Sequence, residues 1–326
     1  MKKDDCPVVV ICGASAGVGR ATAHAFAAAG YAVGLLARSE EGLAAATSEL
    51  EAYDVPTLAI SADIADANAL ALALAAQRFE AELGPIDVWV KSAMVTVFAA
   101  IEQLTPEEIR RVTEVTYLGA VHGTLAALPL MRARNRGVII QVGSALAYRA
   151  IPLQSAYCAA KFALRGFTDS LRCELIHQGS KVKVCMVQLP AINTPQFEWA
   201  RNKLGQRVQP VPPIHDPGVA ARAILSVASA PPRELWVGLP TIKAILGNQF
   251  FPGLLDRLLA RRAWQDQLSE GQPETAGDNL LESVDGLHEV QGRFTRRSRG
   301  HALALSSARV TALLGTCAVL LVLLLI

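Results

Sequence analysis

Short apolar runs alternate with longer, alanine-rich stretches over the first 240 residues of the chain. The runs are Val8–Cys12, Tyr31–Leu36, Thr57–Ser61, Asp87–Val90, Val138–Val142, Val182–Leu189 and Arg233–Val237. Apolar runs of this length, separated by stretches long enough for a helix, are typical of buried strands in a parallel sheet. The pattern therefore predicts an α/β fold in which one doubly wound parallel sheet is covered by helices on both faces.

The pattern changes after about residue 265. Residues 266–307 are rich in Gly, Glu, Asp, Ser and Arg without periodicity, which predicts a flexible polar linker after a domain spanning 1–265. Residues 308–326 form a hydrophobic tail whose last 17 residues carry no charge. That length is just enough to cross a bilayer as a helix. We expect a transmembrane anchor, with a docked or oligomerising helix as the alternative. Arginines ahead of the tail would keep the preceding domain on the cytoplasmic side.

Composition excludes several classes of protein. The net charge of +2 gives no basis for binding nucleic acid by bulk electrostatics. The six cysteines are scattered without a Cys-x2-Cys pair, so neither a disulfide framework nor a metal site is expected. The N-terminus leads straight into the first strand, and no secretory signal is predicted.

A glycine-rich turn follows the first apolar run. It reads Gly13-Ala-Ser15-Ala16-Gly17-Val18-Gly19 and opens an alanine-rich helix. Glycines at such a turn let the backbone approach a pyrophosphate, whose charge the helix N-terminus favours. The spacing is Gly-x3-Gly-x-Gly rather than the Gly-x-Gly-x2-Gly of the general dinucleotide fingerprint.

A second motif carries acid–base chemistry. Tyr157 and Lys161 are four residues apart, so on a helix their side chains share one face. A nearby ammonium lowers the pKa of a phenol toward the range that a general acid needs at neutral pH. Ser144, at the end of an apolar run, is placed to hold a substrate oxygen beside the pair. Taken alone, a Tyr-x3-Lys pair is more often a feature of a helix surface.

Both motifs together resemble the short-chain dehydrogenase/reductase family, in its short branch, over residues 7–240. The resemblance implies a Rossmann-like fold and hydride transfer between NAD(P)(H) and a ketone or secondary alcohol. It implies catalytic roles for Ser144, Tyr157, Lys161 and Thr116. It implies cofactor-binding roles for Gly13, Ser15, Ala16, Gly17, Val18, Gly19, Arg38, Asp63, Ala93, Tyr157, Lys161, Pro190, Ile192 and Thr194.

Arg38 decides the expected cofactor. After the second strand, an acidic residue would bind the adenosine ribose, whereas an arginine pairs with a 2′-phosphate. Ala37-Arg38 therefore favours NADP(H) over NAD(H), the alternative being a solvated arginine at a strand end. By resemblance, Asp63 contacts the adenine and the loop from Pro190 to Thr194 closes over the nicotinamide.

A lid over the substrate is expected at residues 195–215. Phe197 and Trp199 make this segment apolar, which favours a hydrophobic carbonyl or alcohol as the small-molecule substrate. A homo-oligomer is a further possibility, formed through the helices around Tyr117–Met131 and Ala156–His177.

The chain departs from the family pattern at three positions. Lys91 and Ser92 replace two asparagines, and Thr116 replaces the asparagine that is the fourth catalytic member. We expect Thr116 to stand in for that asparagine, or else to be a packing residue. These changes favour an alternative function, a catalytically impaired nucleotide-binding or regulatory protein of the same fold held at a membrane.

Overall fold

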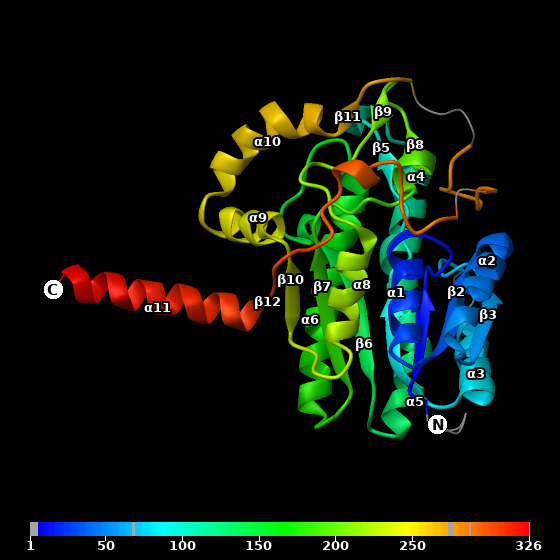
Figure 1. Cartoon of the computed structure of the whole chain (residues 1–326). Helices are drawn as coiled ribbons and strands as arrows, with labels where there is room; N and C mark the ends of the chain where they lie inside the picture. The colour runs from blue at the N-terminus through cyan, green and yellow to red at the C-terminus, as the bar shows by residue number, and fades with distance from the viewer. Residues whose placement is uncertain (1–5, 67–68, 273–276, 287, 326) are drawn as a thin grey trace.

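The computed structural model describes residues 6–66, 69–272, 277–286 and 288–325, which are built around one central sheet (Figure 1). The sheet has eight strands in the order β12-β10-β7-β6-β4-β1-β2-β3. All neighbouring pairs are parallel except β10 and β12, which are antiparallel. The predicted doubly wound α/β fold is confirmed as a single Rossmann-like domain.

Seven strands of the main sheet match the seven apolar runs of the sequence, and the eighth, β12, lies in the stretch predicted as a linker. They are β1 (Val8–Cys12), β2 (Ala32–Ala37), β3 (Thr57–Ser61), β4 (Ile86–Lys91), β6 (Val138–Ser144), β7 (Lys183–Leu189), β10 (Glu234–Val237) and β12 (Ala304–Ser306). Two small sheets lie outside it, formed by β5 (Val97–Phe98) with β8 (Arg201–Asn202), and by β9 (Arg207–Val208) with β11 (Leu268–Ser269).

Strand β1 shows why these runs are continuously apolar. Successive side chains of a strand point to opposite faces of the sheet. Val8, Val10 and Cys12 pack into the core on one face, whereas Val9 and Ile11 pack into the core on the other. Helices cover both faces of the sheet, so a polar residue at any position of the strand would be buried.

Helices cover both faces of the sheet (Figure 1). One core contains side chains from α1 (Gly17–Ala28), α2 (Glu40–Leu50) and α8 (Pro217–Ser226). The opposite core contains side chains from α3 (Ala69–Leu83), α4 (Pro106–Thr113), α5 (Gly119–Ala133) and α6 (Ser155–His177). The remaining α-helices are α7 (Gln196–Trp199), α9 (Leu239–Phe250), α10 (Pro252–Asp266) and α11 (Ser307–Leu325).

Local capping signals set where α4 begins. The Thr105 hydroxyl accepts a hydrogen bond from the Glu108 amide, and the Glu108 carboxylate accepts one from the Thr105 amide, which forms a capping box. Pro106 occupies the first turn, where its missing N–H is not needed. A π-helical turn at Glu114–Leu118 then joins α4 to α5.

Much of the predicted linker contacts the domain. Residues 277–286 and 288–299 lie against the loops at the carboxyl ends of the strands, and β12 extends the sheet by pairing with β10. Helix α11 follows and projects from the body (Figure 1). The boundaries 1–265, 266–307 and 308–326 stay a prediction.

The predicted transmembrane anchor is not supported. Among the residues that the structure describes, no helix is both long enough and apolar enough to cross a bilayer. Part of this expectation falls on residue 326 and on the side chains of residues 317–325, which lie outside the described part of the chain.

Candidate functional site

A cavity of about 510 Å³ opens at the carboxyl ends of the parallel strands. Loops after the strands of a doubly wound sheet form the usual ligand crevice of this fold. The predicted site residues that line the cavity are Gly13, Ser15, Ala16, Gly17, Val18, Gly19, Arg38, Asp63, Ala93, Ser144, Tyr157, Lys161, Pro190, Ile192 and Thr194. Residues up to 181 positions apart in the sequence, Gly13 and Thr194, thus meet in one cavity.

Close packing of the backbone requires glycine at two positions of this turn. Gly13 has φ of +89°, and a Cβ added there would lie 2.5 Å from the amide nitrogen of Ala93. A Cβ on Gly19 would lie 1.9 Å from the carbonyl oxygen of Gly13. The turn can therefore bring the N-terminus of α1 to the edge of the cavity only with glycine at these positions.

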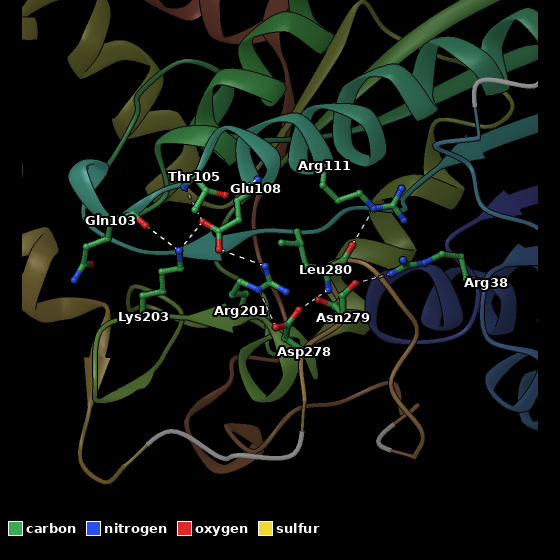
Figure 2. Close-up of polar contacts among 10 residues, drawn as sticks. All are labelled: Arg38, Gln103, Thr105, Glu108, Arg111, Arg201, Lys203, Asp278, Asn279 and Leu280. Carbon is green, nitrogen blue, oxygen red and sulfur yellow. Dashed lines mark hydrogen bonds and ion pairs between the residues drawn. The ribbon is translucent and has the colours of Figure 1, made fainter.

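Arg38 and Asp63 lie at the same end of the cavity. The Arg38 guanidinium donates to the backbone oxygens of Asn279 and Leu281, at 2.7 and 2.8 Å (Figure 2 shows the first). The Asp63 carboxylate pairs with Arg111 at 2.5 Å and accepts a hydrogen bond from the Ala65 amide at 2.9 Å. A cation and an ordered carboxylate thus face the space beside the glycine turn.

Ser144, Tyr157 and Lys161 meet at the other end. Ser144 is the last residue of β6, and its hydroxyl accepts a hydrogen bond from the Leu146 amide. Tyr157 and Lys161 lie on α6, with the Lys161 ammonium nitrogen 5.5 Å from the centre of the Tyr157 ring. That nitrogen donates to the carbonyl oxygen of Val142 at 2.7 Å, which fixes the lysine under the cavity.

Burial controls the protonation of this pair. It lowers the pKa of Lys161 to about 8 and raises the pKa of Tyr157 above its ordinary value, although a hydrogen bond with Ser144 opposes the second shift. The expected lowering of the phenol pKa by Lys161 is therefore not what the structure shows. Burial is the main cause of the raised phenol pKa, and the Lys161 ammonium is bonded to the Val142 carbonyl.

Lys91 fills space beneath the site. It ends β4, is 1 % exposed, and donates to the carbonyl oxygens of Ala93, Val115 at 3.0 Å and Thr116 at 3.3 Å. Burial, followed by the charge of Lys161, lowers its pKa. Its side chain does not line the cavity. Lys91 therefore braces the loop after β4 against the π-helical turn and leaves the cavity open.

Thr116 is the predicted site residue that does not line the cavity. Its hydroxyl donates to the Val95 carbonyl at 3.0 Å and accepts from the Val95 amide at 3.2 Å. The residue is fully buried. The side chain thus ties the π-helical turn to the loop after β4, and the catalytic role predicted for it stays a prediction.

Part of the cavity wall is apolar. Phe197 and Trp199, from the segment predicted as a lid, line the cavity together with Pro212. Helix α10 adds Leu258 and Leu259, which the sequence pattern did not single out. Trp199 also contacts the C-terminal stretch, with its ring 5.3 Å from that of His288.

A further wall of the cavity comes from the C-terminal stretch. We call the described residues 277–286 and 288–292 the strap. Asn279, Ser283, Val284 and His288 of the strap line the cavity. The sequence does not reveal this, because the stretch lacks periodicity and its partners lie up to 272 positions away, as Gly17 does from Glu289. The Leu280-Leu281 pair is its one apolar signal.

The shape and charges of the cavity fit a phosphorylated dinucleotide. A helix N-terminus and the Arg38 cation suit phosphates at one end, and the Tyr157 hydroxyl suits a reacting oxygen at the other. Glycines that admit no Cβ line the path between them. In this fold such a crevice binds a dinucleotide across the strand ends.

Comparisons with known proteins agree with this geometry. The family model described as short chain dehydrogenase matches residues 7–204. A relative from Bacillus subtilis, named uncharacterized oxidoreductase YxnA, is 32% identical over 89% of this chain and 82% of its own length.

Two solved structures share the fold. A short-chain dehydrogenase from Streptomyces avermitilis is 28% identical, with a TM-score of 0.65 over 81% of this chain and 98% of its own. An alcohol dehydrogenase from Thermococcus sibiricus, complexed with 5-hydroxy-NADP, is 25% identical, with a TM-score of 0.62 over 71% of this chain and 96% of its own. The chain belongs to the short-chain dehydrogenase/reductase family of oxidoreductases.

Proposed function

We propose that the protein transfers a hydride between NADP(H) and a hydrophobic ketone or secondary alcohol. The observation that carries the proposal is the single cavity that joins the glycine turn and Arg38 to Ser144, Tyr157 and Lys161. NADP(H), when bound, supplies or accepts the hydride. Arg38 favours the 2′-phosphate, and the NADP analogue in the Thermococcus sibiricus relative supports the same choice.

In the reductive direction, the Ser144 hydroxyl holds the carbonyl oxygen and Tyr157 donates a proton to it. Tyr157 is a neutral phenol at neutral pH, as a proton donor must be, but burial raises its pKa and so opposes release of the proton. The Lys161 ammonium, charged below about pH 8, then stabilises the phenolate that remains. Phe197, Leu258 and Leu259 give the cavity an apolar wall for a hydrophobic substrate.

The test is NADPH oxidation by the purified full-length chain with a panel of ketones, from small and polar to large and apolar. We expect turnover that increases with apolar size and is faster with NADPH than with NADH. Absence of turnover with every ketone, and with secondary alcohols plus NADP⁺, would contradict the proposal.

A nucleotide-binding protein without turnover is the second candidate. It is favoured by Lys91 under the site and by Thr116, whose hydroxyl is engaged by Val95. The same assay separates the two functions, because this candidate binds NADPH but oxidises none of it.

A further inference from the structure

The strap lies along the end of the cavity where Arg38 is found (Figure 2). The Arg38 guanidinium donates one hydrogen bond to the Asn279 carbonyl and one to the Leu281 carbonyl, through different terminal nitrogens. Between these two, the Leu280 carbonyl accepts a hydrogen bond from Arg111 at 3.0 Å. Three consecutive carbonyls of the strap therefore face Arg38, from the predicted adenosine site, and Arg111, which pairs with Asp63.

Contacts with the protein fix the strap in this position. Leu280 is fully buried and belongs to the same hydrophobic core as Ile64 and Val115. The Asn279 amide donates to the Trp199 carbonyl at 2.9 Å. The strap is thus held by its own packing and does not depend on a ligand for its place.

An ion-pair network holds the start of the strap (Figure 2). The Asp278 carboxylate pairs with Arg201 at 2.8 Å and also accepts a hydrogen bond from the Leu280 amide. Arg201 reaches Glu108 at 3.3 Å, and Lys203 pairs with Glu108 at 2.7 Å. Glu108 is 4 % exposed, so this network is screened less than a surface pair.

The far end of the strap holds the glycine turn. The Gly17 amide donates to the Glu289 carbonyl at 2.8 Å, and Arg20 donates to the His288 carbonyl. The strap therefore spans the adenosine side of the cavity from Arg38 to the N-terminus of α1.

The cavity stays open with the strap in place, and Arg38 keeps donors for a ligand. A guanidinium has five N–H donors, of which the strap carbonyls take two. The side-chain oxygen of Asn279, itself a cavity-lining residue, is buried and has no hydrogen-bond partner among the described residues. The strap takes two of the Arg38 donors and the Gly17 amide, and the cavity beside it is the space open to a nucleotide.

We propose that the strap is a positioning segment of the cofactor site, which closes over the adenosine end of NADP(H) and holds Arg38 toward the 2′-phosphate. The inference rests on the proposed function and goes beyond it, because it assigns cofactor discrimination to a segment outside the region matched by the family model.

Two measurements on the full-length chain test this proposal. The first compares dissociation constants for NADPH and NADH in wild type, Asp278→Ala and Glu282→Ala. Asp278→Ala removes the ion pair with Arg201, whereas Glu282→Ala removes the same charge at an exposed strap position with no ion pair among the described residues. We expect Asp278→Ala to weaken NADPH binding ~10-fold and NADH binding less than ~3-fold, as loss of a well-oriented charged hydrogen bond predicts. Glu282→Ala should change neither.

The second measurement is hydrogen exchange of the strap amides in wild type, where NADPH should slow exchange and NADH should slow it less. Tighter NADPH binding by Asp278→Ala, or faster strap exchange with NADPH, would mean that the strap competes with the cofactor and would overturn the inference. If Asp278→Ala weakened NADPH binding and NADH binding equally, the proposal that the strap holds Arg38 toward the 2′-phosphate would be wrong. A wild-type chain that binds neither nucleotide would instead refute the proposed function, and the inference with it.

Discussion

Tyr157 and Lys161 are four residues apart on α6 and both line the cavity, where Lys161 is buried and Tyr157 is half-buried. Their spacing alone predicts that they share a helix face. The direction of their pKa shifts is not predictable from the spacing, because it depends on how deeply the surrounding elements enclose them. A raised phenol pKa opposes proton donation, whereas a cation beside the ring favours the phenolate left behind.

The lowered pKa of Lys161 predicts a pH dependence of stability. The folded chain releases this proton near pH 8, whereas an unfolded lysine holds it until about 10.5. Between these values the unfolded state binds more protons, so stability rises with pH. The difference in free energy of unfolding between wild type and Lys161→Met should increase as the pH is raised beyond 8. The increase should be at most about 1.4 kcal/mol per pH unit. Urea denaturation from pH 7 to 10 measures it, and a flat or falling difference would contradict the assignment.

Lys91 departs from the family pattern, and its side chain nevertheless has a structural role. Three carbonyl oxygens surround its nitrogen, as many as an ammonium has hydrogens. Two of them, from Val115 and Thr116, lie in the π-helical turn. The sequence marks Lys91 as unusual but does not indicate that its side chain lies under the cavity floor.

At the scale of elements, Gly13 in the glycine turn and Gly30, which follows α1, offer a matched pair of substitutions. Gly13 and Gly30 both have positive φ, of +89° and +82°, but a Cβ at Gly30 has nothing within 4 Å. We expect Gly30→Ala to cost about 1 kcal/mol of stability from backbone strain alone. Gly13→Ala should cost several-fold more and abolish NADPH binding, because the Cβ collides with the backbone of Ala93.

Chemical denaturation and NADPH titration of both variants measure this difference. Equal stability losses in Gly13→Ala and Gly30→Ala, with NADPH binding intact, would show that the close approach to Ala93 is not required.

Elements governed by local signals are predictable from the sequence. The strands follow from apolar runs, and α4 begins at its capping box with Pro106 in the first turn. The strap is not predictable in this way. Its hydrogen bonds join residues as far apart as Arg38 and Leu281, and no local pattern encodes such pairings. The same holds for the apolar wall that Leu258 and Leu259 of α10 add to the cavity.

At the scale of the whole molecule, the C-terminal stretch completes the domain. Strand β12 adds an antiparallel edge to the sheet, and Val310 of α11 packs with Trp236 and Ile245. Composition predicted a polar linker here because its residues are hydrophilic and aperiodic. The described part of this stretch packs on the domain through a few apolar side chains, such as Leu280 and Val310, and composition does not reveal these contacts.

Docking of α11 can be tested with two substitutions on the same helix. Val310 is 5 % exposed, whereas Leu313 is 58 % exposed. Val310→Ala should lower the free energy of unfolding by about 1 kcal/mol or more, since it opens space in a packed cluster. Leu313→Ala should change it by less than ~0.5 kcal/mol. Equal effects in thermal or chemical denaturation would contradict packing of α11 on the domain.

The central claim is that Tyr157 exchanges the proton during hydride transfer. Its most direct test is steady-state NADPH oxidation by Tyr157→Phe, with NADPH affinity measured alongside. Tyr148→Phe is the control, since it removes the same atom from a tyrosine that bonds Glu234 and does not line the cavity. We expect Tyr157→Phe to lose ~10²–10⁴-fold in kcat with NADPH affinity nearly unchanged, and Tyr148→Phe to keep its turnover. A Tyr157→Phe variant that turns over ketone at the wild-type rate would contradict the account.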